Sequence, residues 1–345
     1  MSGAKGFRVR TGSRLHIGLM DMNASLGRVD GGLGVGLEAP GWDVTVQERR
    51  TAGSGRPGRA KRGGWSYPEV IRDVVESVRS GMSPKGRYDI HVNSSLPFHV
   101  GLGARTQLSL AIGTAVAKLD GMDVGPREVA EMVGRGGTSG IGVMAFEKGG
   151  FIVDAGHSFA MKRGFLPSRF SNAPPPPVMF HSQLPDEWVF IVAIPGVHPD
   201  TMRTTEEGMS GEAERSLFES RCPVPADETA NIARIVLMQA IPAVIEGDLA
   251  AFGAAVDGLQ HLGFKKVENE LRGADGKGLM WLMKENGASG CGLSSFGPAT
   301  FGVVQEGSRA NRLENAVRDH FGKDGRMGLV FRARPSDHGA VIEEL

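Results

Sequence analysis

The stretch from Leu96 to Thr114 places a short glycine loop directly before an apolar helix. Pro97 ends a predicted strand, and Gly101 and Gly103 lie in the loop. The first amides of a helix have no partner inside it and carry the positive end of its dipole. Glycine lets the backbone approach a ligand closely. The arrangement is typical of a phosphate site, although a single Gly-Leu-Gly also occurs in ordinary strand-to-helix turns. Three side chains of the first helical turn could bind the phosphate together with the backbone amides: Arg105, Thr106 and Gln107.

Polar residues near the start of the chain form a second candidate group. Arg14 and His16 share one face of a predicted strand, because side chains alternate along a strand. Asp21 and Arg28 follow in the next loop. Arginine matches the planar fork of a carboxylate. This segment is therefore evenly balanced between a structural Asp–Arg ion pair and a site for a carboxylate ligand.

Two more glycine-rich runs carry hydroxyl side chains. Gly134–Gly142 includes Gly137, Thr138 and Ser139, and Gly287–Pro298 includes Ser294 and Ser295. Such hydroxyls could bind an anion or a metal-bound oxygen, or they could form turns and helix caps. Four polar, glycine-rich segments in one chain predict a site for a polyphosphate or a sugar phosphate.

The remaining reactive residue types indicate structural roles. His157 could be a general base, but a hydrogen-bonded structural histidine is the favoured interpretation, and the other histidines lack metal-ligand spacing. Lys265 and Lys266 are interpreted as a solvated face. The two cysteines, Cys222 and Cys291, exclude a disulfide framework and fit a reducing cytoplasm.

The composition limits the classes of partner. The chain has 345 residues, with 39 Lys+Arg and 39 Asp+Glu, so its formal net charge is zero. A general role on nucleic acid or on a membrane surface has no electrostatic support. No apolar run approaches the roughly 18 residues of a membrane span, and the N-terminus shows no signal-peptide pattern.

Helical and strand patterns alternate along both halves, which predicts an α+β layered protein of two domains. The first half predicts strands near residues 7–10, 15–19, 42–47, 90–92 and 151–154, and helices over 68–80 and 126–133. Between these two helices, one face of a further buried helix is marked by Leu108, Ala111, Ile112, Ala115 and Leu119. The second half predicts strands over 188–194, 299–304 and 327–332, and helices over 228–246 with a break at Pro242, 249–259, 278–286 and 308–321. The polyproline run Pro174–Pro177 places the expected boundary between 1–178 and 179–345.

The glycine loops together resemble the signature motifs of the GHMP kinase superfamily. Pro97-Phe-His-Val-Gly-Leu-Gly-Ala-Arg-Thr is similar to the Pro-x-x-x-Gly-Leu-Gly-Ser-Ser phosphate loop, and Gly287–Pro298 is similar to the C-terminal glycine motif. The resemblance spans almost the whole chain in the right order. It implies a ribosomal-S5-like N-terminal domain, a ferredoxin-like C-terminal domain and a site between them.

The chain departs from the kinase pattern at two positions. Ala104-Arg105 replaces the serine pair, and the run Gly137–Gly142 ends in glycine where many superfamily kinases carry an aspartate that assists phosphoryl transfer. A kinase needs a nucleotide, Mg²⁺ and a positioned hydroxyl acceptor. An ATP-dependent small-molecule kinase is therefore the second hypothesis, and an inactive ligand sensor is the third.

A narrower resemblance, to the β-ribofuranosylaminobenzene 5′-phosphate synthase family, fits better. It rests on Arg14-Leu-His-Ile-Gly-Leu-Met-Asp21, Thr106-Gln107, Gly134–Gly142 and Phe151-Ile-Val-Asp-Ala-Gly-His157. This family transfers phosphoribosyl from 5-phosphoribosyl 1-diphosphate to 4-hydroxybenzoate or 4-aminobenzoate, with loss of CO₂ and pyrophosphate, on the route to methanopterin-type cofactors. The resemblance implies a decarboxylating pentosyltransferase that uses Mg²⁺, and we expect a cytoplasmic homodimer.

The same resemblance suggests roles for the candidate residues. Asp21 stabilises the ribosyl cation or acts as a base, Arg28 holds the benzoate carboxylate, and His16 belongs to the same catalytic group. Phosphates are assigned to the first loop and to its neighbours, namely Arg14, Gly101, Gly103, Arg105, Thr106, Gln107, Gly137, Thr138, Ser139, Ser294 and Ser295. The metal ligands and the choice between the two benzoates stay open.

Overall fold

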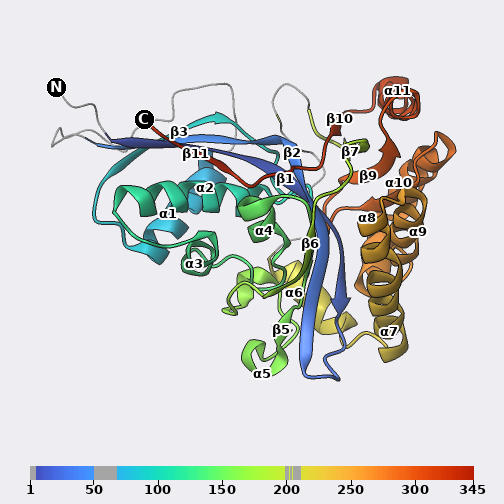
Figure 1. Cartoon of the computed structure of the whole chain (residues 1–345), viewed down its shortest axis with the longest axis horizontal. Coiled ribbons are helices and arrows are strands. Elements are labelled where there is room, and N and C mark those ends of the chain that lie inside the picture. The colour runs from blue at the N-terminus through green and yellow to red at the C-terminus, as the bar shows by residue number, and fades with distance from the viewer. Residues whose placement is uncertain (1–4, 50–67, 199–201, 203, 205–210) are drawn as a thin grey trace.

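Two antiparallel sheets organise the chain, as the computed structural model shows (Figure 1). The structure describes residues 5–49, 68–198, 202, 204 and 211–345. The predicted loop Thr51–Gly64 lies outside these residues. A seven-stranded sheet has the order β11-β1-β2-β4-β6, with β3 and β5 also paired to β2, and a four-stranded sheet has the order β10-β7-β9-β8.

A long hairpin forms the spine of the first sheet. Its strands are β1 (Gly6–Asp21) and β2 (Arg28–Glu48), which pair antiparallel along nearly their whole length. The sequence predicted two separate strands within β1, but they form one strand with irregular register near Thr11 and His16. Gly12 allows this continuity, because a Cβ there would lie 1.8 Å from the Leu37 carbonyl oxygen. The other strands are β3 (Tyr88–Ser94), β4 (Phe151–Asp154), β5 (His157–Ser158), β6 (Val178–Ser182) and β11 (Val341–Glu344).

Helices cover one face of this sheet (Figure 1). Nearly every residue of α2 (Ala104–Leu119) is buried, so this helix is the core element that the glycine loop introduces. Around it lie α1 (Pro68–Met82), α3 (Pro126–Met132) and α4 (Ile141–Lys148), as the sequence predicted for the first two. The second glycine-rich run ends at Gly140, two residues earlier than predicted, because α4 starts there. The short α5 (Phe159–Lys162) and η1 (Ser168–Phe170) were not predicted.

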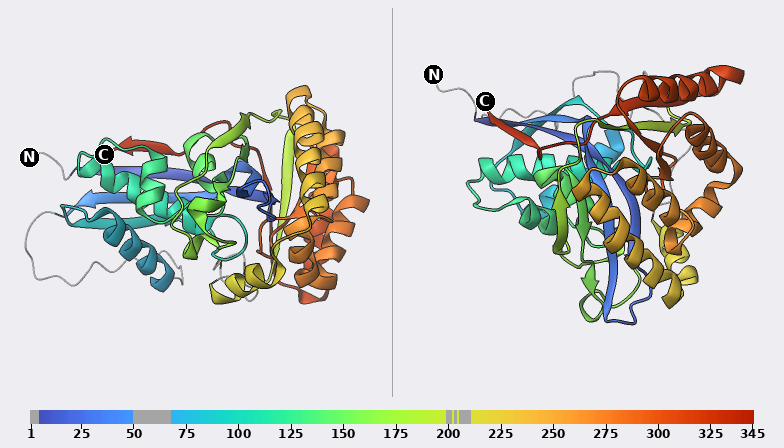
Figure 2. Two further views of the ribbon diagram at one scale, coloured as in Figure 1. Left: turned by 90° about the horizontal axis from the view of Figure 1, so that it is seen from below. Right: turned by 45° about the vertical axis from the view of Figure 1, so that its right-hand side comes forward.

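The second sheet has the connectivity of a ferredoxin-like domain. Its strands are β7 (Trp188–Pro195), β8 (Gly290–Leu293), β9 (Thr300–Gln305) and β10 (Gly328–Ala333), and all pairings are antiparallel. Helices form a layer beside this sheet (Figure 2). They are α6 (Glu212–Arg221), α7 (Ala226–Ile235), α8 (Ile241–Glu246), α9 (Leu249–Leu259), α10 (Gly263–Glu285) and α11 (Ser308–Gly322). The mixed helices and sheets confirm the predicted α+β class.

The segment Ala226–Glu246 is long and apolar enough to cross a membrane by length and composition alone, although no such span was expected. In the structure it is three consecutive helical pieces, with the π-helix η2 (Val236–Ala240) between α7 and α8. Pro242 lies in the first turn of α8, where its missing N–H breaks the regular helical bonding, as predicted. Ile232, Val236 and Ala240 are buried in the protein core, as in the core helix of a globular domain.

Strand pairing in the first sheet crosses the expected boundary at residue 178. β6 pairs with β4 and β11 pairs with β1, so residues on both sides of the second domain belong to the first sheet. The polyproline run is not a free linker. Pro175 and Pro176 are buried against Gly136 and Gly140 of the second glycine-rich loop. The division into residues 1–178 and 179–345 stays a prediction.

The two domains interlock through their glycine loops. A Cβ at Gly101 would lie 2.0 Å from the Ser294 carbonyl oxygen, and one at Gly297 would lie 2.0 Å from the Val100 carbonyl carbon. The Ala299 amide donates to the Val100 carbonyl at 3.0 Å. Glycine is required because two backbones touch here, and not only because a ligand must approach, as the sequence suggested.

Replacing Gly297 with alanine should lower the free energy of unfolding by about 2 kcal/mol, because the methyl group overpacks a backbone contact. Urea denaturation measures this change. Gly278→Ala is the matched control, since nothing lies within 4 Å of that position in α10, and alanine there should be neutral or stabilising. Equal stability of Gly297→Ala and the wild type would contradict the interlock.

Candidate functional site

The first glycine loop ends in a left-handed glycine that starts α2. Gly103 is the N-cap residue, with φ 75° and ψ 16°, and Gly101 has φ 96°. Both conformations favour glycine. Arg14 of β1 lies against this loop, where its Nη1 donates to the Gly101 carbonyl and its amide donates to the Leu102 carbonyl at 3.1 Å. The strand therefore fixes the loop and brings a cation to the start of the helix.

Arg135 of the second glycine-rich loop reaches the same place. Its Nε and Nη2 donate to the Thr106 hydroxyl at 3.2 and 3.1 Å, in the first turn of α2. Arg135 was not among the site residues predicted from the sequence. The available signal was its position as the arginine inside the Gly134–Gly142 run.

Four arginines that repel one another in sequence form a basic cluster, which we define as Arg14, Arg105, Arg135 and Arg169. Burial, followed by repulsion from Arg135, lowers the pKa of Arg14 to about 10. Burial and repulsion from Arg105 lower the pKa of Arg135 to about 10. Among the described residues, no carboxylate lies within ion-pair distance of Arg14, Arg105 or Arg135. Guanidinium groups that repel one another at a helix N-terminus create a strong preference for an anion.

Residues of α10 extend the cluster from the second domain. Lys265 is buried, bonds the Glu268 carboxylate and donates to the Leu293 carbonyl at 3.2 Å. The expectation that Lys265 is solvated is wrong, because the first turn of α10 packs into the interface between the domains. Lys266 is exposed, as expected.

His16 lies buried between the two domains. Its amide donates to the Ser294 hydroxyl at 3.0 Å, and its carbonyl accepts from the Ser295 amide at 3.1 Å. Its Nδ1 has no hydrogen-bond partner in the described structure. Burial, with the charges of Arg14 and Lys265, holds the pKa of His16 well below its usual range. The ring is therefore a neutral polar group inside the cluster.

Three predicted substrate-binding residues make bonds inside the protein. The Ser294 hydroxyl donates to the Gly101 carbonyl at 2.7 Å, and the Gln107 amide donates to the Gly142 carbonyl at 2.7 Å. Thr138 donates its hydroxyl to the Leu166 carbonyl at 2.9 Å. All three are buried, so the structure gives them loop-fixing contacts. Gly137 packs against Ser171, and Ser295 adopts a left-handed conformation with φ 54°.

A buried carboxylate organises the second glycine-rich loop. Asp154 accepts from the amides of Gly140 at 2.8 Å and Gly156 at 2.9 Å, and Ser139 lies 3.4 Å from its Oδ2. Burial raises the pKa of Asp154 to about 6 despite these bonds. This carboxylate holds the loop that carries Arg135.

A second buried carboxylate, Asp30, lies in the same region. It bonds Lys162 Nζ through both oxygens at 2.7 Å and His157 Nδ1 at 2.6 Å. The other ring nitrogen of His157 contacts the Pro174 carbonyl at 3.0 Å. The geometry supports the structural interpretation of His157.

Asp21 and Arg28 lie at the far end of the hairpin and do not bond each other. Asp21 caps a turn by accepting from the amides of Asn23 and Ala24, and Arg28 donates to the carbonyls of Ala155 and Gly156. Seven residues of extended strand separate Asp21 from Arg14, roughly 23 Å. Asp21 is the cross-strand partner of Asp30, so this end adjoins the Asp30 group.

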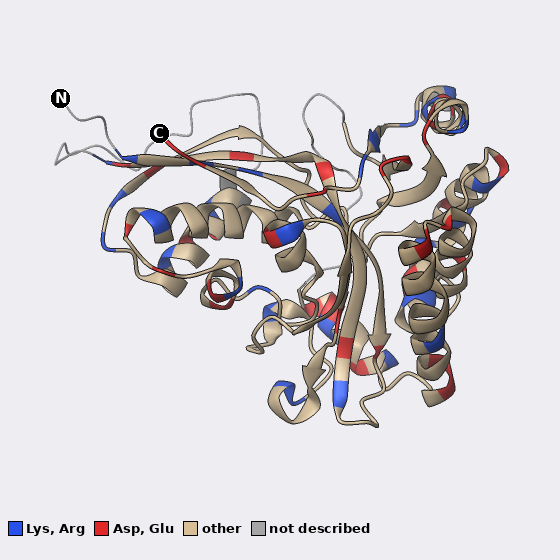
Figure 3. Cartoon of the chain, in the orientation of Figure 1, with Lys and Arg blue, Asp and Glu red and all other residues tan. Residues whose placement is uncertain are grey.

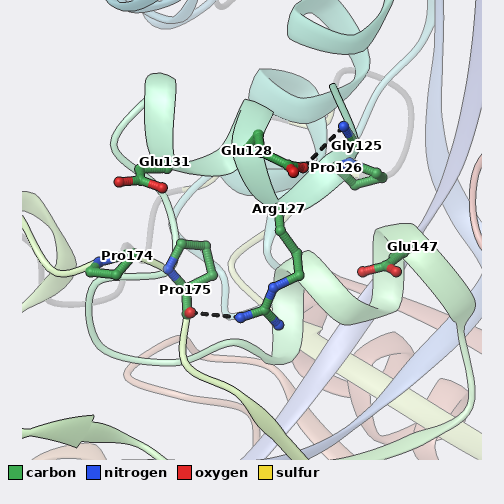
Figure 4. A pocket seen from close by; sticks show the side chains of 8 residues that line it. All are labelled: Gly125, Pro126, Arg127, Glu128, Glu131, Glu147, Pro174 and Pro175. Atoms are coloured by element: carbon green, nitrogen blue, oxygen red, sulfur yellow. Dashed lines mark hydrogen bonds between the residues drawn. The ribbon is translucent and has the colours of Figure 1, made fainter. Parts of the chain in front are cut away.

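A surface pocket of about 290 Å³ lies elsewhere, between α3 and the polyproline run (Figure 4). Arg127 crosses it and donates to the carbonyls of Pro175 and Pro176 at 2.8 and 2.9 Å. None of the predicted site residues lines this pocket. Its arginine is used to hold the polyproline run, which in turn supports the second glycine-rich loop.

Charges of both signs are distributed over both domains, and neither covers a whole face of the ribbon (Figure 3). The concentration of cations at the start of α2 is therefore local. Among the described residues, no group of three or more His, Cys, Asp or Glu side chains could hold a metal ion. The arrangement can bind a multiply charged anion at the basic cluster, with carboxylates and a neutral histidine beside it.

The fold and this loop arrangement define the class of protein. The GHMP kinases N terminal domain matches residues 69–150, and the GHMP kinases C terminal domain matches residues 240–323. The crystal structure of homoserine kinase from Cytophaga hutchinsonii superposes with a TM-score of 0.62 at 13% identity, covering 99% of each chain. The predicted two-domain GHMP-type fold is confirmed.

Sequence comparison identifies the family within this class. The chain is 41% identical over 317 residues to beta-ribofuranosylphenol 5′-phosphate synthase of Methanothermobacter thermautotrophicus, covering 91% of this chain and 93% of the relative. It is 39% identical over 337 residues to the protein of the same name from Archaeoglobus fulgidus, covering 97% and 99%. The chain belongs to the beta-ribofuranosylphenol 5′-phosphate synthase family, which confirms the narrower resemblance.

Asp154 should make stability depend on pH in a defined direction. Because its folded pKa of about 6 exceeds the ordinary value of 3.8, the folded state keeps a proton that the unfolded chain has lost between those values. The free energy of unfolding should therefore fall by up to about 3 kcal/mol as pH rises from 4 to 6. Asp154→Asn should lack this component. Urea titrations of both proteins test this, and parallel pH profiles would contradict the assignment.

Proposed function

We propose that this protein joins the phosphoribosyl group of 5-phosphoribosyl 1-diphosphate to 4-hydroxybenzoate, with release of CO₂ and pyrophosphate. The observation that carries the proposal is the convergence of Arg14, Arg105 and Arg135 on the N-terminus of α2. Family membership supports the same reaction. The product would serve the synthesis of a methanopterin-type cofactor.

The donor substrate fits the charge of the basic cluster. A diphosphate leaving group develops negative charge as the bond to ribose breaks, and fixed donors near that charge lower the barrier. Arg14 and Arg135 use some of their donors to hold the loops together, and the rest remain for phosphate oxygens. The amides after Gly103 add the positive end of α2. We assign the diphosphate to this end of the site.

Mg²⁺ would accompany the diphosphate in this scheme. Magnesium in such sites is bound through one or two carboxylates together with substrate phosphates. Among the described residues, no group of three or more His, Cys, Asp or Glu side chains could hold the metal alone, so in this scheme the diphosphate would supply ligands. The metal would neutralise the leaving pyrophosphate.

The acceptor is assigned from the relatives' name, which contains a phenol. A phenol product requires 4-hydroxybenzoate rather than 4-aminobenzoate as the acceptor. We place its carboxylate toward the hairpin end, where Arg28 donates Nε and Nη2 to backbone carbonyls and retains Nη1. Asp21 lies roughly 23 Å along β1 from Arg14, so its role toward the ribosyl cation, whose carbon bears the diphosphate, stays a prediction from the family resemblance.

Other functions have weaker support. The solved kinase shares only the fold, at 13% identity, and Ala104-Arg105 still departs from the kinase serine pair. The cytoplasmic location and the homodimer stay predictions.

Purified protein with 5-phosphoribosyl 1-diphosphate, Mg²⁺ and 4-hydroxybenzoate should release CO₂ and pyrophosphate in equal amounts. Trapped ¹⁴CO₂ from carboxyl-labelled substrate and a coupled pyrophosphate assay measure the two products. Omitting either substrate is the control. Release of neither product, with phosphoribosyl diphosphate still bound in calorimetry, would favour the ligand-sensor hypothesis; ATP-dependent phosphorylation of an alcohol would favour the kinase hypothesis.

Two arginine variants should distinguish the region proposed to bind the diphosphate from the region proposed to bind the benzoate. Arg135→Ala should raise the KM for phosphoribosyl diphosphate on the order of 100-fold, as expected for loss of a buried charged contact, and leave the KM for benzoate nearly unchanged. Arg28→Ala should raise the KM for benzoate instead. Each variant is the control for the other in steady-state kinetics. Both variants raising the same KM would contradict the assignment of two ends.

A further inference from the structure

One buried histidine lies where the glycine loops of both domains meet strand β1. Where β11 ends, β1 continues with only β2 paired beside it, and the loops line its other edge. The His16 amide donates to the Ser294 hydroxyl at 3.0 Å, and its carbonyl accepts from the Ser295 amide at 3.1 Å. The Arg14 amide bonds the first glycine loop, also at 3.1 Å. The backbone of His16 is therefore fixed between the two loops.

The side chains of Arg14 and His16 share one face of β1, because the register with β2 is regular between them. Their cross-strand partners are Gly36 and Gly34, so β2 places no side chain opposite either residue. A Cβ at Gly34 would lie 2.6 Å from Ile141 Cγ2, at the start of α4. The face that carries His16 is thus covered by the helix that follows the second glycine-rich loop.

Arg14 sets the distance of His16 from the start of α2. A Cβ at Gly103 would lie 3.0 Å from Arg14 Cγ and 3.4 Å from Arg14 Cζ, so the guanidinium lies against the N-cap residue of the helix. Two residues of strand advance the chain by roughly 7 Å. His16 is therefore the next side chain along the strand from the position proposed for the diphosphate.

The His16 ring holds a hydrogen-bonding group that the protein does not use. The residue is 6% exposed, and its Nδ1 has no partner among the residues that the structure describes. A buried nitrogen without a partner lowers stability, so it calls for an explanation such as a role in binding or catalysis. Burial, with the charges of Arg14 and Lys265, holds the pKa of His16 well below its usual range. A neutral ring with its proton on Nε2 can accept a hydrogen bond at Nδ1.

We propose that His16 Nδ1 accepts a hydrogen bond from the 2-hydroxyl of the ribose in the phosphoribosyl donor. This rests on the proposed function. In the α-anomer of the donor, the hydroxyl on carbon 2 lies on the same face of the sugar as the diphosphate on carbon 1. A neutral acceptor beside the diphosphate therefore meets this hydroxyl. Ionised phosphate oxygens have no proton to donate to it, and they are bound by the arginines instead.

The contact acts on the cation that forms during transfer. As the bond from the anomeric carbon to the diphosphate oxygen breaks, pyrophosphate leaves with the electron pair, and positive charge develops on that carbon. Hydrogen bonds to a sugar 2-hydroxyl strengthen in transition states of this kind. The proton stays on the hydroxyl, whose oxygen gains electron density and stabilises the neighbouring cation. A protonated imidazole has no acceptor at either nitrogen, so the neutral state of His16 is essential to this role.

Two unreactive donor analogues test the contact. In the cyclopentane analogue of the donor, carbon replaces the ring oxygen, so no stabilised cation forms and the ligand stays intact. Removing its 2-hydroxyl should weaken binding to the wild type about 10-fold in calorimetry, as expected for loss of one hydrogen bond. His16→Phe should bind the two analogues equally. His16→Asn should keep the preference, because its amide oxygen can take the place of Nδ1.

Thr114→Val is the matched control, since Thr114 Oγ1 is another buried atom without a partner, in the middle of α2 and away from the loops. This variant should bind both analogues as the wild type does. A merely structural role of His16 would weaken binding of both analogues to His16→Phe by the same factor and leave the preference unchanged, which would overturn the proposal. His16→Leu repeats the test if the phenylalanine variant does not fold.

Turnover separates this proposal from the proposed function. With 5-phosphoribosyl 1-diphosphate and 4-hydroxybenzoate, kcat of His16→Phe should fall on the order of 100-fold, more than the donor affinity falls, because the contact strengthens as charge develops. A wild type that prefers the analogue with the 2-hydroxyl but releases no CO₂ would overturn only the transfer reaction. A wild type that releases CO₂ and binds both analogues equally would overturn only the role of His16. Binding of neither analogue would overturn both.

Discussion

The backbone contact between the two glycine loops is the constraint on which the site depends. Val100 and Gly101 of the first domain touch Ser294 and Gly297 of the second with no room for a side chain between them. This contact sets the position of the start of α2 relative to α10. The Ser294 hydroxyl fixes this contact further, because it donates to the Gly101 carbonyl and accepts from the His16 amide. Small displacements here would move groups of both domains relative to the phosphate loop.

The electrostatic state of the site follows from that fixed geometry. Burial disfavours the charged forms of Arg14 and Arg135, and so does repulsion of Arg14 by Arg135 and of Arg135 by Arg105. Their internal partners are a carbonyl and a hydroxyl, which cannot neutralise them. A bound polyanion would offset this repulsion between the arginines. The conversion of a kinase-type serine pair to Ala104-Arg105 adds a further cation to the same turn, which agrees with a diphosphate that is bound as a leaving group.

The second glycine-rich loop is held in place by contacts with other buried residues. Asp154 holds the Gly140 amide, Arg127 holds the polyproline run, and that run packs on Gly136 and Gly140. Burial destabilises the charged form of the Asp154 carboxylate, as its raised pKa shows. Such a cost is common where a loop must be held in one conformation for function.

The sequence by itself determined the glycine loops, the order of most helices and strands, and the family resemblance, because these depend on local pattern. A continuous apolar run predicted β7, and helical spacing of apolar residues predicted α2. The predicted bounds of β7 and α11 are close to those observed. Local pattern does not determine contacts between residues far apart in the chain. It therefore missed α6, β6 and β11, and it placed Lys265 in solvent, although the fold buries that residue between domains. Only the tertiary structure decided which predicted residues share a site: it joined Arg14 and Arg105 with the unselected Arg135, and it used Ser294 and Gln107 for internal bonds. The physical reason is that packing between distant segments decides which donors and acceptors are used inside the protein and which remain for a ligand.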